Sequence, residues 1–141
     1  MFELNEQLQR DTIVVGCFPL SLVLLQRDSQ YPWLILVPQQ PEVTEIHHLS
    51  SSDRIRLMEE SCRLAEAMVD LFAPQKMNVA ALGNIVPQLH VHHIARFAKD
   101  PAWPHPVWGK VPAVPYSDAA LADRLQRLRH ALAGDDFRSI V

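Results

Sequence analysis

The 141 residues are 48% hydrophobic and 21% charged, with a net charge of -3, a composition that argues against disorder and predicts one domain over residues 1–141. The charge also argues against a nucleic-acid partner, which usually requires a basic surface. No apolar run approaches the roughly 20 residues of a membrane span, and the polar start of the chain does not read as a secretory signal. Cys17 and Cys62 lack the spacing of a zinc pair, and two lone cysteines are typical of a reducing setting, so we expect a cytoplasmic protein.

The first part of the chain predicts a short helix and a β-hairpin. Phe2, Leu4 and Leu8 lie on or near one side of a helix over residues 2–11. The apolar runs "LSLVLLQ" and "WLILVP", residues 20–26 and 33–38, are separated by turn residues. This pattern is typical of two antiparallel strands.

Residues 49–72 form the clearest predicted helix. Ser51 or Ser52 can cap it, Asp53 suits its first turn, and Pro74 ends it. We expect Cys62 to be a small buried hydrophobe. Spacings of three and four residues place it on one apolar face, which is expected to pack on the core: Ile55, Met58, Cys62, Ala65, Val69 and Phe72.

The rest of the chain predicts two more strands, an irregular segment and a second helix. The strands cover residues 77–84 and 85–97, with a tight turn near Gly83 and Asn84. Prolines exclude regular structure from most of residues 98–116, and a C-terminal helix covers residues 117–133. With a core over residues 12–97, this order indicates an α+β fold: an antiparallel sheet of about five strands, one long helix and a C-terminal helix.

The stretch "VPQLHVHHIARF", residues 86–97, holds the most reactive side chains. Alternate residues of a strand share a face, so Gln88, His90 and His92 point one way, while His93 and the apolar residues point to the core. A His-x-His pair can bind a metal if a third ligand is near. It can also serve nucleophilic and acid–base chemistry on phosphorus, or simply be exposed on an edge strand. The residues alone leave these three interpretations open.

The string "VPQLHVHHIAR" resembles the signature of the histidine triad (HIT) family of nucleotide hydrolases and transferases, in which three histidines alternate with apolar residues. Gln88 takes the first histidine position, His90 the second and His92 the third. The hairpin ending in "LILVP", the long helix, the strand before the motif and the arginine after it occur in the family's order. The resemblance covers roughly residues 20–97.

This resemblance implies a reaction, a binding mode and an assembly. His90 matches the family's nucleophile, which attacks the α-phosphate of a nucleotide and forms a nucleotidyl-histidine that water then hydrolyses. His92 matches the histidine that contacts the phosphate or the leaving group. Family members bind the nucleobase in an apolar cleft beside the sheet and need no protein-held metal for the covalent step, so the resemblance implies neither metal nor cofactor. They commonly form two-fold homodimers that join sheets and pair the long helices.

The chain departs from the family pattern in three places. Gln88 can orient a neighbour through hydrogen bonds but cannot titrate. His93 replaces an apolar residue, and its parity makes it a satisfied buried or interface histidine. The phosphate-binding loop before the motif is short and leaves Asn84 as its candidate, either a phosphate ligand or a turn residue.

Other candidate ligands lie outside the motif. Gln26 and Arg27 close a predicted strand where relatives often hold an amide near the nucleotide, and Arg27 would suit a phosphate. Asn78 can reach a ribose or phosphate, or cap a strand, and Arg96 can be a rim charge or a phosphate contact. Three side chains of the proline-rich segment either shape substrate choice or pack that segment down: Trp103, His105 and Trp108.

Two classes of function follow. The leading hypothesis is a cytoplasmic, homodimeric nucleotide hydrolase or nucleotidyl transferase that acts through His90 on a dinucleoside polyphosphate or a nucleotide phosphoramidate, with no membrane partner. The alternative is a nucleotide-binding module of the same fold with little or no turnover, which Gln88 favours. A metal-binding regulator is a further rival, although His92 and His93 face opposite sides of the strand.

Overall fold

Six strands pair antiparallel in the order β4-β5-β3-β2-β1-β6 in the computed structural model, which describes residues 1–141. The strands are β1 (Thr12–Cys17), β2 (Ser21–Gln26), β3 (Trp33–Pro38), β4 (Lys76–Ala81), β5 (Val91–Arg96) and β6 (Arg138–Ser139). The helices are α1 (Glu6–Asp11), α2 (Ser51–Phe72) and α3 (Asp118–Leu132), with a 3-10 turn at Ile46–His48. The expected α+β fold is therefore confirmed. No helix combines the length and apolarity needed to cross a bilayer.

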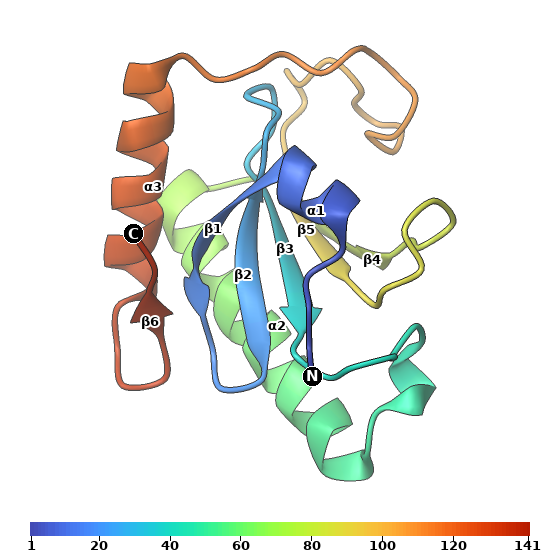
Figure 1. Ribbon diagram of the computed structural model, residues 1–141. Coiled ribbons are helices and arrows are strands. Elements are labelled where there is room, and N and C mark those ends of the chain that lie inside the picture. Colours follow the sequence, from blue (N-terminus) through green and yellow to red (C-terminus); the bar gives the residue numbers. More distant parts are fainter.

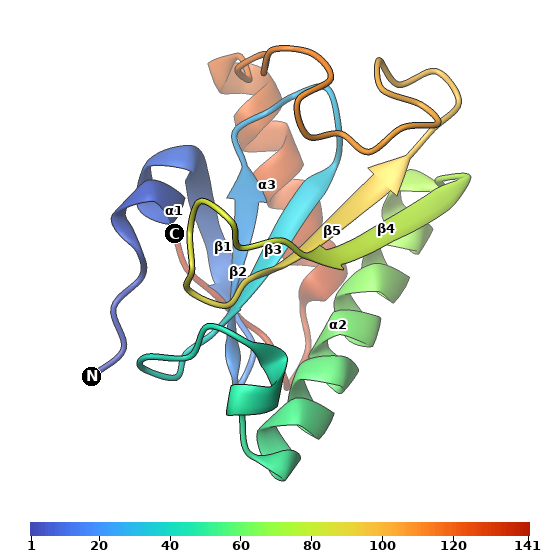
Figure 2. The ribbon, with the colours of Figure 1, turned by 90° about the vertical axis from the view of Figure 1, so that its right-hand side faces the viewer.

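The sheet separates two hydrophobic cores (Figures 1 and 2). Because side chains alternate along a strand, Leu34 and Leu36 of β3 enter one core and Trp33, Ile35 and Val37 the other. Helices α2 and α3 cover the first core. The second lies beneath α1, the loop before β5 and the proline-rich segment. A site on the second face is therefore walled by irregular chain, whereas the first face is sealed by helices.

The buried face of α2 differs from the predicted one. Leu57, Leu64 and Met68 enter the core, whereas Ile55 and Met58 are 66% and 64% exposed. The expectation that Cys62 is buried was wrong, because Cys62 is exposed on the same outer face. The helix carries two apolar faces, and Glu60 interrupts the one that packs. The core accommodates Glu60 because its Oε2 accepts a hydrogen bond from the Leu20 amide at 2.8 Å.

The cap of α2 also differs from expectation. Ser50, rather than Ser51 or Ser52, is the N-cap, and its Oγ accepts a hydrogen bond from the Asp53 amide at 3.1 Å. The other end is as predicted, because Ala73, in a left-handed conformation, precedes Pro74 and closes the helix. The cap fixes where α2 begins, directly after the segment that borders the site.

The connection between β4 and β5 is a loop over residues 82–90, so the predicted tight turn at Gly83 was wrong. β5 begins at Val91, and His90 lies in the loop just before it. Strands β1 and β6 were not among the predicted strands, although the β-branched run "TIVVGC" signals β1. The regular pairing of β1 with β2 is interrupted at Val15, between Val14 and Gly16. A Cβ on Gly16 would meet Phe137 and the β6 residue Arg138.

A buried ion pair anchors the proline-rich segment at the end of β5. The Arg96 guanidinium donates two hydrogen bonds to Asp100, at 2.8 and 3.0 Å, and both side chains are 2% exposed. It also donates to Asn78 Oδ1 at 2.8 Å. Arg96 is therefore neither a rim charge nor free to bind a phosphate, and it positions the segment that follows.

We expect Asp100→Ala to lower the free energy of unfolding by about 3–5 kcal/mol, because the change leaves Arg96 buried without its partner. Urea titration measures this loss. Asp123→Ala is the matched control: its pair with Arg127, at 3.0 Å, has side chains 59% and 62% exposed, and should cost less than about 1 kcal/mol. Equal losses in the two variants would contradict the structural role of the Arg96–Asp100 pair.

Candidate functional site

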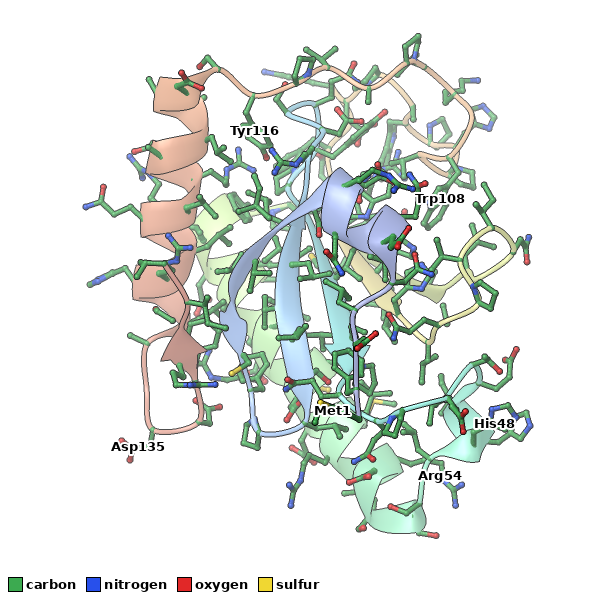
Figure 3. All side chains as sticks on the ribbon, viewed as in Figure 1. Met1, His48, Arg54, Trp108, Tyr116 and Asp135 are labelled. Carbon is green, nitrogen blue, oxygen red and sulfur yellow. The ribbon has the colours of Figure 1, made fainter.

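Two cavities share a wall that contains His90. The larger, about 630 Å³, lies between the segment before α2 and the loop over residues 82–90, and His47 and Arg54 contribute to its polar lining. The smaller, about 360 Å³, is lined mainly by apolar and aromatic groups, among them Leu8, Ile35 and Trp108. Figure 3 shows Arg54 and Trp108 at well separated heights on the side of the molecule that carries this loop. A ligand bound at His90 can therefore extend in two directions.

His90 is held in one orientation by main chain. Its Nδ1 lies 2.7 Å from the carbonyl oxygen of Gln88, and the residue is 5% exposed. A carbonyl oxygen only accepts, so Nδ1 carries the proton and the lone pair of a neutral ring lies on Nε2. This is the tautomer that a nucleophilic imidazole requires.

His92 lies on the same side, as strand parity predicted, with ring centroids 4.9 Å from His90. Its neighbours across the sheet are Ile35 of β3 and Ala80 of β4. The indole Nε1 of Trp33 donates a hydrogen bond to His92 Nδ1 at 2.9 Å. Burial, followed by the proximity of His90 and His93, lowers the pKa of His92 to about 3. The ring is thus neutral at any physiological pH.

His93 faces the opposite core and is fully buried, as its parity predicted. Its Nδ1 donates to the Val91 carbonyl at 3.0 Å, and its Nε2 lies 2.7 Å from Ser61 Oγ of α2. With Nδ1 protonated, the Ser61 hydroxyl is the donor to Nε2. Burial lowers the pKa of His93 to about 4, although the Val91 carbonyl raises it. His93 is a satisfied structural histidine that joins β5 to α2.

Gln88 uses its side chain on the N-terminal segment. Its Oε1 accepts from the Asn5 amide at 2.9 Å, and its Nε2 donates to the Glu3 carbonyl at 2.8 Å. Only its main-chain oxygen contacts the His90 ring. The amide therefore holds the chain that leads into α1, where Gln7 and Leu8 line the smaller cavity.

The other predicted ligands are divided between the cavities and the rest of the surface. Asn84 lines both cavities and Gln26 lines the smaller one. Arg27 is exposed and borders neither cavity, and its amide bonds the Asp11 carbonyl. Asn78 also borders neither and accepts its hydrogen bond from Arg96. Of the three aromatic residues left open in the proline-rich segment, Trp108 lines the smaller cavity, whereas Trp103 lies against Arg96, 5.6 Å from its guanidinium carbon, and His105 is exposed.

Several residues at the site had not been singled out in the sequence. His47 and Arg54 line the larger cavity, and Trp33, Gln7 and Asp11 the smaller one. They belong to no local motif and come from the hairpin, the 3-10 turn, the start of α2 and α1. The only usable signal was the indole of Trp33, which is 7% exposed and bears a polar N–H that a buried site must satisfy. In no place do three His, Cys, Asp or Glu side chains gather as metal ligands do.

The comparisons with known proteins agree on one family. The model of the HIT domain matches residues 7–99. A histidine triad protein from Marinobacter aquaeolei is 50% identical, with a TM-score of 0.91 over 94% of this chain and 96% of that one. Histidine triad proteins from Bradyrhizobium japonicum and Sinorhizobium meliloti are 42% and 40% identical, with TM-scores of 0.92 and 0.91, each over 94% of this chain and 98% of theirs. No curated protein sequence gives a significant match.

The buried histidines predict a stability that falls in mild acid. An unfolded histidine takes up a proton below about pH 6.5, whereas folded His93 stays neutral down to about pH 4. Between these values the unfolded state binds the extra proton, so the free energy of unfolding decreases by up to about 1.4 kcal/mol per pH unit for each such histidine. We expect His93→Gln to flatten this slope by about one proton, measured by urea titrations from pH 7 to pH 4.5.

His130→Gln is the matched control, because this side chain of α3 is exposed to water in the folded state as well. It should leave the slope as it is in the unaltered protein. Curves for His93→Gln and the unaltered protein that run parallel over this range would show that His93 is protonated in the folded state.

Proposed function

The chain belongs to the histidine triad (HIT) family, and we propose that it is a nucleotide hydrolase or nucleotidyl transferase that acts at the α-phosphate of a nucleoside 5′-phosphate derivative. The substrate is a dinucleoside polyphosphate or a nucleotide phosphoramidate, and no metal or cofactor takes part in the covalent step. Cys17 and Cys62 are both free thiols, which supports the cytoplasm as its location.

The observation that carries this proposal is the state of His90. Its proton is held on Nδ1 by the Gln88 carbonyl, at 2.7 Å, and its ring borders both cavities. In the first step the Nε2 lone pair forms a bond to the α-phosphorus, and the bond to the leaving group breaks with its electron pair. A phosphate leaves as the anion, whereas the amine of a phosphoramidate takes up a proton from solvent as it leaves. The imidazole becomes cationic, and the same carbonyl stabilises this charge through the Nδ1–H. Water then attacks phosphorus, loses a proton to solvent and returns the electron pair to Nε2.

The two cavities support a division of the substrate at this phosphorus. The smaller one offers aromatic and aliphatic surface from Trp33, Trp108 and Ile35, which suits a nucleoside, with Gln26 at hand for its polar groups. The larger one contains Arg54 and His47, and suits the leaving group. Asn84 borders both cavities, which supports a role as hydrogen-bond donor to a phosphate oxygen rather than that of a turn residue.

The alternative is a nucleotide-binding module with little turnover, because Gln88 stands where the family has its first histidine. The contacts of Gln88 favour the enzyme. The ring of His90 depends on the main-chain oxygen of residue 88, and that oxygen is present whatever the side chain. Replacing histidine by glutamine therefore removes a titratable group without removing the support of the nucleophile.

We expect His90→Ala to lower turnover of a dinucleoside polyphosphate or a nucleotide phosphoramidate by about 10⁴-fold or more, as loss of a covalent nucleophile does. Mononucleotide release measures the rate, and intact mass after rapid quenching detects the nucleotidyl adduct. His90→Asn should still bind nucleotide by calorimetry, and His130→Ala serves as the control. Full activity in His90→Ala would exclude the covalent mechanism, and binding without product in the unaltered protein would identify a module.

A homodimer is the assembly we propose. The outer face of α2 leaves Ile55, Met58 and Val69 exposed by 66%, 64% and 45%, with Cys62 among them. Ile55 and Val69 lie at equal distances along the helix on either side of Cys62. A two-fold axis near Cys62 would therefore pair the two helices antiparallel, with Ile55 of each helix packed against Val69 of the other. β4 is an edge strand of the sheet, and its residue Val79 is 51% exposed. The unpaired edge of β4 offers a second contact between the two chains.

This arrangement brings the two Cys62 thiols together, so a short bis-maleimide should link two chains into a covalent dimer. Cys62→Ser should abolish the product, because Cys17 is buried. Met58→Glu should shift the protein toward monomer in sedimentation experiments, whereas Val141→Glu, also an exposed apolar position, should not. A protein that sediments as a monomer at micromolar concentration would contradict the proposal.

A further inference from the structure

The only polar group of the Trp33 side chain donates a hydrogen bond to one of the histidines of the site. Trp33 is the first residue of β3, its side chain belongs to the second core, and the residue is 7% exposed. The Nε1–H lies 2.9 Å from His92 Nδ1. An indole nitrogen donates and never accepts, so His92 Nδ1 receives this bond as an unprotonated atom. The direction of the bond follows from the chemistry of the two rings alone.

We propose that Trp33 is a positioning residue that fixes His92 in the tautomer with its proton on Nε2, so that the ring presents an N–H donor to the cavity beside His90. The contact itself is a property of the fold, and its catalytic meaning rests on the proposed function. His92 Nε2 has no partner within the chain, and the residue lines the smaller cavity. Burial keeps the His92 ring neutral, with a pKa lowered to about 3, so the two ring nitrogens share one proton. Nδ1 accepts the bond from Trp33, and the proton is therefore on Nε2.

The two rings of the site are thereby given opposite roles. His90 has its proton on Nδ1 and a lone pair on Nε2, whereas His92 has its lone pair on Nδ1 and its proton on Nε2. Their centroids lie 4.9 Å apart at an interplanar angle of 73°. A phosphoryl group between them meets a nucleophile on one side and a hydrogen-bond donor for its oxygens on the other. The reverse tautomer of His92 would set a lone pair against an anionic oxygen.

The aromatic neighbours explain why the indole keeps its place. Trp108 lies edge-on to Trp33, with centroids 5.8 Å apart, and 5.0 Å from the His92 ring. The ring of Tyr31 also approaches Trp33, with centroids 6.2 Å apart. The rings of Trp33, Trp108 and His92 therefore contact one another in pairs. Only Trp33 contributes a hydrogen bond to His92, so the packing of the cluster and the tautomer can be separated experimentally.

Trp33→Phe keeps an aromatic ring in the core and removes the donor. With histidine ¹⁵N-labelled throughout the full-length protein, long-range ¹H–¹⁵N spectra report which ring nitrogen is protonated. In the unaltered protein we expect His92 to show a protonated Nε2 and an unprotonated Nδ1. In Trp33→Phe the Nδ1-protonated form of His92 should appear, while His90 keeps its proton on Nδ1. Trp108→Phe disturbs the same cluster but retains the Trp33 donor, and should leave the His92 tautomer unchanged.

Turnover provides the second readout. We expect kcat of Trp33→Phe to fall by roughly tenfold with little change in KM, because a mixture of tautomers loses part of the donor that is worth about 10²–10³ when fully removed. A single Nε2-protonated His92 in Trp33→Phe, or a protonated Nδ1 in the unaltered protein, would overturn the assignment. The spectra need no substrate, so they test Trp33 even if the protein proves to bind nucleotides without turning them over.

Discussion

The exclusion of water from β5 is the constraint on which the site depends. His92 and His93 stay neutral, because the low-dielectric interior disfavours their charged form and lowers the pKa of both rings. A neutral imidazole has one donor and one acceptor. Three histidines lie in β5 or directly before it, and each has a hydrogen-bond partner that is compatible with only one tautomer. The partners are the Gln88 carbonyl for His90, the Trp33 indole for His92 and the Val91 carbonyl for His93. The same side chain thus takes two forms, with the proton on Nδ1 in His90 and His93 and on Nε2 in His92.

The fold was predictable from the sequence where a pattern was local and strong. Alternation along the histidine stretch placed His90 and His92 together and His93 in the opposite core, although His90 itself precedes the strand. The long helix was predicted, but its buried face was not. Both faces of the helix show apolar residues at three- and four-residue spacing, and the face that is buried also contains the charged Glu60. Only the position of the sheet decides between them, and that is a property of the folded chain.

The site was predictable to the extent that it is carried by one strand. The motif indicated His90, the proposed nucleophile, and its neighbour His92, and both line a cavity. The walls of the two cavities come from α1, β3, the start of α2 and the proline-rich segment, and no local spacing relates them. Arg96 and Asn78 illustrate the limit, since both are polar and close to the motif in sequence or in the sheet. Arg96 binds Asn78 and Asp100 instead, and neither Arg96 nor Asn78 lines the two cavities at His90. Charge near a motif does not say whether the charge is already neutralised.

Gln88 bears on how relatives of this chain are recognised. The residue at the first position of the motif supplies the His90 ring with a main-chain oxygen, which all twenty amino acids possess, while its side chain is bonded to the N-terminal segment. Its identity can therefore drift during evolution without removing the support of the ring two residues later. Surveys of genomes that demand three alternating histidines would pass over such chains. A pattern of two histidines, with a tryptophan at the start of the facing strand, would retain this chain.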